Sequence, residues 1–488
     1  MDRRGERAIT GGGEDGGRGE KSSDEVNVVV VEDRTTNKAL TQVFPTTSTS
    51  TIQRPWRNPP VAGLDVRTHT NRISLIVFLL HLLFIIAAVC FFSLKTIHGI
   101  LNDEVEVRRH VYFWIPPIEG TVLLAILLAF MWQKTIREWP GFMVKFILWF
   151  CFGSTMAAGV LLVFFSKPAT SGLGAALIIF SIGTGLYACW VMKRVHFAGD
   201  VLKKSFRPAT RFPDLNHPTY GMLFLGFVWI SVWCFAVIGA LKFYYPPVTV
   251  LMMVLSLMWT AEVMRNVTNL TVSRVIALYY LRGIESNTWF SFVRIMSKNL
   301  GSACLGSLFA PMIEASRIVA RGLNLLEGED EFMFSCAHCC LRVMEAIFNY
   351  SNSWAFVHIA AYGKGFVTSS KDAWDLFERS GMVALVDADM TRSLCFLSGV
   401  SSGSVCAIFA ASWTFSTRRE YTATVSLLAL FVGYLMTRIG MALPHACVGC
   451  YYICYAENPS NQLFDSTIPN RINDIISGRD IVAPVYRR

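Results

Sequence analysis

A glutamate stands inside a long apolar run, in the segment MWTAEVMRNVTNL, with aromatic and amide residues around it at helical spacing. The set is Trp259, Glu262, Asn266 and Asn269. On an α-helix these four side chains share one face. A carboxylate and an aromatic face both attract a quaternary ammonium ion, which carries charge but has no hydrogen to donate. The pattern therefore predicts a cation-binding lining. The alternative, with equal weight, is that Glu262 pairs with Arg265 at a membrane boundary.

A second group of polar and aromatic residues lies in FNYSNSWAFVHIAAYGKGF, a half-apolar stretch among much cleaner apolar runs. Asn352, His358 and Tyr362 are its candidate substrate-binding residues, because ionisable and polar groups inside membrane spans usually face a bundle interior or a watery cavity. Tyr350 and Trp354 extend the aromatic stripe. Such stripes are more often packing than a ligand cage, and a single histidine is more often structural than a proton carrier.

Ionisable residues elsewhere in apolar runs are further candidates for the same reason. Together they are His81, Glu119, Glu262, Glu314, Glu345 and His358.

Two cysteine-rich stretches, CAHCC at 336–340 and HACVGCYYIC at 445–454, have metal-like spacing. A structural zinc site needs four ligands in a tetrahedral array. Packing, or palmitoylation beside a membrane, accounts for these cysteines more simply. We therefore expect no metal and no cofactor.

Enzymatic signatures are absent from the sequence. It has no Walker loop, no HExxH and no nucleophile elbow, so neither an ATP-driven pump nor a common hydrolase is expected. We expect a protein that is not an enzyme.

The elements that must position these residues are membrane helices. The 488 residues are 53% hydrophobic and only 16% charged, with mean hydropathy +0.43, whereas soluble domains carry about 25% charged residues. Apolar runs of about 20 residues are long enough to cross a bilayer. The 44 Lys and Arg against 35 Asp and Glu fit anionic lipid surfaces, and nucleic acid is not an expected partner.

The predicted fold class is all-α, a polytopic membrane protein with about ten transmembrane helices. We expect a disordered cytosolic tail at 1–72, a transmembrane domain at 73–456 and a cytosolic tail at 457–488. The spans are expected at about 73–94, 114–132, 142–165, 172–192, 219–241, 248–281, 295–318, 342–362, 394–415 and 421–455.

Four features of these spans bear on the fold. The sixth should run unbroken until Gly283, and the tenth should continue past Arg438. Gly399 and Gly403 form a GxxxG pattern in the ninth, which allows close helix packing. Basic loops after the second and fourth spans place both termini in the cytosol.

Four later segments resemble the choline transporter-like family of membrane proteins. They are ALYYL at 277–281, GSACLGSLFAPMIEASRIV at 301–319, FNYSNSWAFVHIAAYGKGFVTSSKDAW at 348–374 and CYYICYAENP at 450–459. The third is the most specific, and the similarity covers about 248–459. Phe356 departs from the usual tyrosine, and the short loop after the first span is typical of plant and fungal members.

The resemblance implies a choline transporter-like fold of ten spans. It also implies a transporter for choline or a related organic cation, ethanolamine included, by facilitated or proton-coupled movement. Its implied location is the plasma membrane, with an endomembrane as the alternative. The family motif is treated as a fold signature, so no binding residue is carried over from it. A non-transporting membrane trafficking or lipid-homeostasis factor is the competing hypothesis. Oligomeric state is left open.

Overall fold

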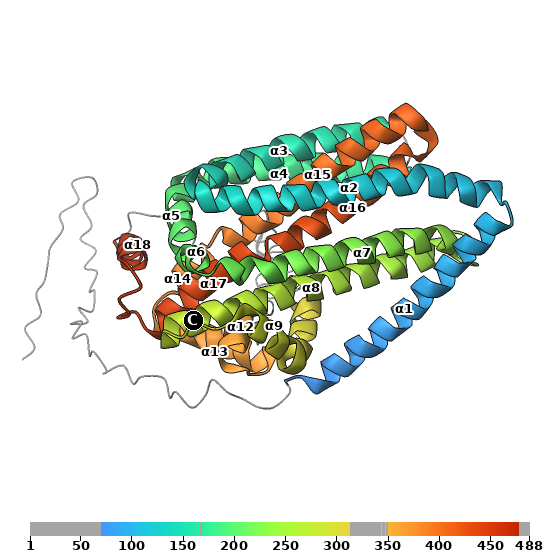
Figure 1. Cartoon of the computed structure of the whole chain (residues 1–488). Helices are drawn as coiled ribbons and strands as arrows, with labels where there is room; N and C mark the ends of the chain where they lie inside the picture. The colour runs from blue at the N-terminus through green and yellow to red at the C-terminus, as the bar shows by residue number, and fades with distance from the viewer. Residues whose placement is uncertain (1–69, 166–167, 313–342, 344–346, 348–349, 478–488) are drawn as a thin grey trace, which may run out of the picture. The chain divides into compact units, whose positions relative to one another are not determined.

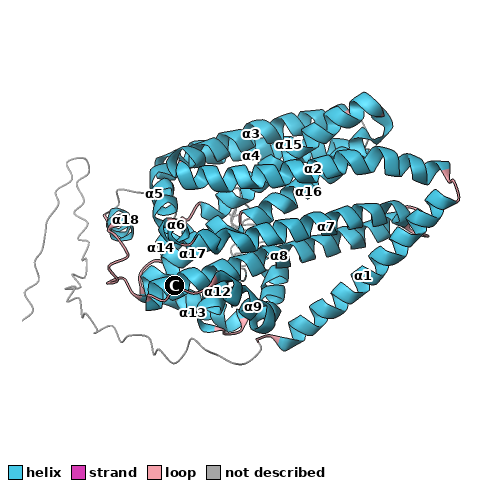
Figure 2. Ribbon diagram, viewed as in Figure 1, coloured by secondary structure: helices cyan, strands magenta, loops and turns pink. Residues whose placement is uncertain are grey.

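The computed structural model describes residues 70–165, 168–312, 343, 347 and 350–477. Every regular element among these residues is a helix (Figures 1 and 2). The longer helices are α1 (Arg72–Leu101), α2 (Val105–Glu138), α3 (Pro140–Phe164), α4 (Pro168–Val191), α7 (His217–Ala240), α8 (Pro246–Arg282), α15 (Thr391–Thr417) and α16 (Arg419–Gly440). These eight are long and apolar enough to cross a membrane. The prediction of an all-α polytopic membrane protein is confirmed.

Shorter elements connect and cover the long helices. They are α5 (Val195–Ser205), α6 (Arg207–Arg211), α9 (Thr288–Arg294), a π-helical turn at Ile295–Asn299, helical residues 300–312, α12 (Ala355–Tyr362), α13 (Phe366–Arg379), α14 (Val383–Asp387), α17 (Ala442–Glu457) and α18 (Thr467–Ile476). Two 3₁₀ turns, Met192–Arg194 and Pro213–Asn216, lie beside α5 and α7.

The expected seventh and eighth spans fall partly outside the described residues, as do the tail at 1–69, Glu314, Glu345 and the CAHCC stretch. The count of ten spans therefore stays a prediction. Within the described part, the expected helix at 342–362 is wrong, because the chain leaves the helical conformation at 351–354. There the backbone N–H of Asn352 donates to the Ser370 hydroxyl at 3.2 Å instead of to a helical carbonyl.

The helix α8 is the longest element, with 37 residues and a length of about 55 Å. Pro246 and Pro247 start it, since the first helical positions need no backbone donor. Gly283 ends it at φ +66°, a left-handed conformation that glycine adopts without strain. The prediction that this helix runs unbroken to Gly283 is confirmed.

The environment of α8 changes near its middle. Large apolar side chains on its first half are exposed, the last being Met258, and none is exposed within residues 259–282. The second half packs instead against α12 and α17, beside which it runs (Figure 1). The first half therefore faces lipid and the second half is enclosed by protein.

The small residues of α15 let α16 approach closely, as the GxxxG pattern predicts. A Cβ on Gly403 would lie 2.5 Å from the Leu430 carbonyl oxygen, and one on Gly399 would lie 3.1 Å from the Tyr434 ring. These contacts fix the face of α16 that carries Tyr434 and Arg438.

Candidate functional site

Trp259 lies on α8 beside α1 and the helical residues 300–312. Its ring centroid is 4.6 Å from that of His81 and 5.3 Å from that of Phe78. The indole nitrogen donates to the Cys304 carbonyl at 3.4 Å. The His81 ring is held in turn by Ser256, whose hydroxyl lies 3.1 Å from Nε2. Phe78, His81 and Trp259 form what we call the aromatic cluster, a suitable surface for a cation.

Glu262 faces α16 rather than α1. Nη2 of Arg438 donates to both of its carboxylate oxygens, at 2.9 and 3.2 Å, and Nη1 of Arg265 donates to one of them. The three side chains are between 12% and 17% exposed. No other carboxylate among the described residues pairs with either arginine. We call this set the ion triad, and it carries a net charge of +1.

The sequence therefore anticipated part of this geometry. The expected Glu262–Arg265 pair forms, but Arg438, 176 positions along the chain, joins it. Arg438 also lies 5.6 Å from the centroid of the Tyr434 ring on its own helix.

The helix that carries Arg438 is interrupted three residues after it, at Met441. The tenth span was expected to be one continuous helix from about 421 to 455. The structure instead shows two helices, α16 and α17, on either side of Met441. Pro444 explains this, because it lacks the N–H that would donate to the Gly440 carbonyl. Gln133 from α2 donates to that carbonyl instead. The freed backbone oxygen is thus satisfied from a neighbouring helix.

Asn266 and Asn269 are buried further along α8. The Asn266 amide nitrogen donates to the Ser307 hydroxyl at 2.9 Å, while its carbonyl oxygen has no hydrogen-bond partner. The Asn269 nitrogen lies 2.8 Å from Nδ1 of His445, and its oxygen accepts from Ser273 at 3.1 Å. Asn269 therefore ties α8 to α17, whereas Asn266 retains a free acceptor.

Asn352 joins the turn before α12 to α13. Its backbone nitrogen donates to the Ser370 hydroxyl at 3.2 Å, and its side chain donates to the Ser370 carbonyl. This residue is fully buried. Its observed contacts hold two short helices together.

His358 and Tyr362 meet Glu457 at the ends of α12 and α17. The His358 and Tyr362 ring centroids are 5.0 Å apart, and Nε2 of His358 is 3.8 Å from the Glu457 carboxylate. Tyr362 hydrogen-bonds that same carboxylate. His358 is buried, and neither ring nitrogen makes a hydrogen bond. These two candidates lie together, apart from the Trp259 contacts.

The helix α12 is enclosed by the later helices. The rings of Phe356 and Phe366 would lie within 2.8 Å of a Cβ on Gly306. The Ile359 carbonyl accepts from Asn299 at 3.1 Å.

The structure thus divides the seven predicted residues. Trp259 belongs to the aromatic cluster, and Glu262 belongs to the ion triad. The other five candidates contact neighbouring short helices or residues 300–312. Sequence reasoning missed Phe78 and Arg438. A charge inside the tenth apolar run was the available signal for Arg438. Glu119, another candidate, accepts from Ser231 at 2.9 Å between α2 and α7.

Metal ligation finds no support in the described part of the chain, where no group of three or more His, Cys, Asp or Glu side chains could hold an ion. The cysteines of α17 are buried free thiols there.

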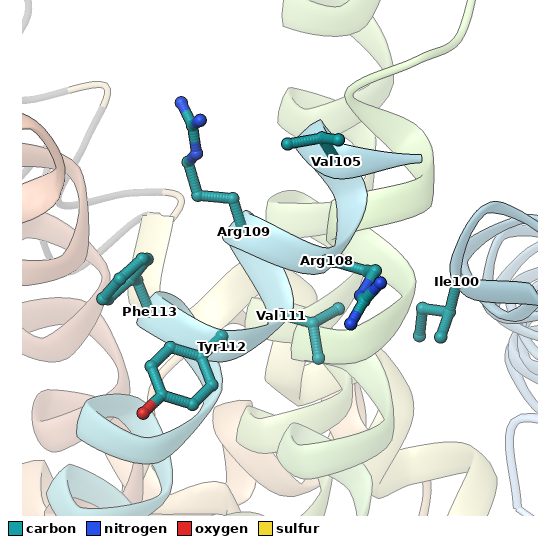
Figure 3. A pocket seen from close by; sticks show the side chains of 7 residues that line it. All are labelled: Ile100, Val105, Arg108, Arg109, Val111, Tyr112 and Phe113. Carbon is teal, nitrogen blue, oxygen red and sulfur yellow. The ribbon is translucent and has the colours of Figure 1, made fainter. Parts of the chain in front are cut away.

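A hollow of about 490 Å³ lies at the start of α2, away from the predicted residues (Figure 3). None of the seven candidates lines it. Its lining is Ile100, Val105, Arg108, Arg109, Val111, Tyr112 and Phe113.

Comparison with known proteins decides the family. Residues 175–460, more than half of the chain, match the family described as plasma-membrane choline transporter. The chain belongs to the choline transporter-like family. The match includes α8, α12, α15, α16 and α17, so the ion triad lies wholly within it.

Several curated relatives agree. A CTL-like protein of Dictyostelium discoideum is 24% identical over 353 residues, which cover 70% of this chain and 62% of that protein. Protein PNS1 of Mycosarcoma maydis is 23% identical over 69% of this chain and 68% of its own. Choline transporter-like protein 5 of Xenopus tropicalis is 28% identical over 41% of this chain and 30% of its own.

Proposed function

We propose that this protein transports choline or a closely related organic cation across a membrane. Family membership and the name of the Xenopus relative support the class of substrate. The observation that carries the proposal is on α8, where the Trp259 indole and the Glu262 carboxylate lie three positions apart at the change from lipid-facing to enclosed helix.

The chemistry of choline matches these two groups. A quaternary ammonium cannot donate a hydrogen bond, so a site must hold it by aromatic faces and negative charge. The aromatic cluster supplies the faces, and Glu262 supplies the charge. In this proposal the unpaired side-chain oxygen of Asn266 also faces the route that the cation takes past Trp259 and Glu262. Asn269, Asn352 and Tyr362 hold the surrounding helices in place through their hydrogen bonds, and the buried His358 ring packs beside Tyr362.

The proposal includes location and sidedness. Basic loops after the second and fourth spans favour cytosolic termini, and the family description favours the plasma membrane. The cation is carried without chemical conversion.

The test is uptake of labelled choline by cells that lack their own choline transport and express the full chain. We expect saturable uptake that unlabelled choline competes. The Glu106→Gln variant, which alters an exposed carboxylate at the start of α2, is the matched control and should transport normally.

The same assay separates the mechanisms and the substrates. An imposed proton gradient accelerates uptake only if transport is proton-coupled. Competition by ethanolamine reports how strictly the methyl groups are recognised. Absence of saturable uptake in either direction, with the protein at the cell surface, would reject the proposal and favour a trafficking or lipid-homeostasis role.

A further inference from the structure

The ion triad contains more positive charge than its single carboxylate balances. Arg265 and Arg438 both donate to Glu262, and no second carboxylate among the described residues joins them. A site with net positive charge repels a cation. The arrangement in this structure is therefore unfavourable for the substrate that the family implies, unless one arginine withdraws.

The two arginines differ in how easily each can withdraw. Arg265 lies three positions from Glu262 on the same helix, so the pair is held by α8 itself. Arg438 reaches the carboxylate from α16, and its contact depends on the packing of two helices. Only the Arg438 contact can be broken by relative movement of α8 and α16.

Breaking the Arg438 contact leaves no buried carboxylate without a partner. Removal of one member from a buried ion pair usually destabilises a protein strongly, because the other charge is left uncompensated. Here Glu262 keeps Arg265, so the carboxylate stays paired and only the Arg438 guanidinium, which is 17% exposed, loses its ionic partner. Arg438 keeps the Tyr434 ring face, at 5.6 Å from its guanidinium carbon, as an alternative partner.

The helix that carries Arg438 is interrupted close to this side chain. Arg438 lies three residues before the interruption at Met441, where Pro444 removes a helical hydrogen bond. On its other side, α15 holds the Arg438 stem, since a Cβ on Gly399 would lie 3.3 Å from Arg438 Cγ. The stem of the Arg438 side chain thus contacts α15, and its guanidinium group lies at the free end of that stem, on the helical turn before the interruption at Met441.

We propose that Arg438 is a displaceable counter-ion that occupies Glu262 when no substrate is bound and yields the carboxylate to the substrate ammonium. This inference rests on the proposed function, and it assigns to Arg438 the control of cation access to the Glu262 carboxylate. Arg438 competes with the cation for one carboxylate, and the two states differ in whether α16 is linked to α8 through that charge.

The size of the effect follows from competition. A carboxylate that is free for only a tenth of the time binds its ligand about tenfold more weakly than one that is always free. Neutralising Arg438 removes the competitor, and the apparent affinity for choline rises. Neutralising Arg265 leaves Arg438 on the carboxylate and gives a much smaller rise.

The experiment measures the KM of choline uptake for the wild-type chain, Arg438→Gln, Arg438→Lys and Arg265→Gln at matched surface abundance. We expect Arg438→Gln to lower KM on the order of tenfold. Arg438→Lys retains the charge, so its KM should fall much less than that of Arg438→Gln, and the KM of Arg265→Gln should also fall much less. Glu106→Gln, whose carboxylate is exposed, is the control and should stay within about twofold of wild type.

An unchanged or raised KM for Arg438→Gln, with wild-type uptake intact, overturns this inference and leaves the proposed function standing. A KM for Arg438→Lys as low as that for Arg438→Gln also overturns it, because the charge would then be irrelevant. If the Arg438→Gln protein does not reach the cell surface, the KM of Arg438→Met supplies the same comparison, because methionine is also uncharged. Absence of saturable uptake by the wild-type chain rejects the proposed function, and this inference with it.

Discussion

The two regions that the sequence singled out differ in how their polar groups are satisfied. Around α12, Asn352 and Tyr362 each have a specific partner on a neighbouring short helix, although the buried His358 ring makes no hydrogen bond. Around the middle of α8, one carboxylate is shared by two guanidiniums, and an indole lies half-buried among aromatic rings. Polar residues with fixed partners indicate a scaffold. Residues with surplus partners indicate a site whose contacts can exchange.

The largest expected effect on stability comes from the ion triad. Glu262→Gln leaves two part-buried guanidiniums without a carboxylate, and we expect a loss of about 3–5 kcal/mol in the free energy of unfolding. Thermal unfolding of the purified protein in detergent measures this. Adding Arg438→Gln should recover part of the loss, since one unpaired charge is removed.

Glu106→Gln is the control for that comparison, because its carboxylate is exposed. A Glu262→Gln protein that unfolds at the same temperature as Glu106→Gln would show that the triad contributes nothing to the fold.

A smaller effect on stability is expected where Thr70 and Asn71, just before α1, contact Gly301. A Cβ on Gly301 would lie 2.5 Å from the carbonyl oxygens of Thr70 and Asn71, and backbone cannot yield as a side chain can. We expect Gly301→Ala to cost about 1–3 kcal/mol. The same unfolding assay measures it.

Gly153→Ala is the matched substitution, since no atom lies within 4 Å of the added Cβ. It should be neutral or slightly stabilising, because alanine favours a helix. Equal behaviour of the two variants would mean that the close approach at Gly301 is not important for stability.

The smallest effect concerns the contact that precedes α18. Burial alone would raise the pKa of the Asp465 carboxyl, but hydrogen bonds from Lys204, Thr467 and Tyr451 lower it to about 2. A lowered pKa in the folded protein means that the charged carboxylate stabilises it at neutral pH, and that this stabilisation disappears as pH falls from about 4 toward 2.

Asp465→Asn should therefore lower the free energy of unfolding by up to about 1 kcal/mol at pH 7. The difference from wild type should shrink as pH falls toward 2 in the same detergent. A difference that stays constant with pH would contradict the assignment to this carboxylate.

Much of the fold could be predicted because local signals decide it. Pro246 and Gly283 mark the ends of α8, and apolar length identifies the crossing helices. The turn at 351–354 was missed because the backbone N–H of Asn352 donates to the hydroxyl of Ser370, 18 positions along the chain, and the local pattern does not show this. The interruption at Met441 was missed although Pro444 was visible in the sequence.

Only the residues of the site that lie on one helix, α8, could be predicted from the sequence. Spacing along α8 identified Trp259 and Glu262, but a partner from another helix carries no spacing signal. Phe78 and Arg438 belong to helices that meet α8 only in the folded protein. Sequence alone therefore proposed an anionic face, and the structure adds the arginine that covers it.

The most direct test compares a tryptophan from each region. Trp259 belongs to the aromatic cluster, whereas Trp354 is packed between Phe377 and Tyr452 beside α12. We predict that Trp259→Leu raises the KM of choline uptake on the order of tenfold, while Trp354→Leu lowers protein abundance without changing KM. An unchanged KM for Trp259→Leu, with a raised KM for Trp354→Leu, would contradict the account and place the cation beside α12.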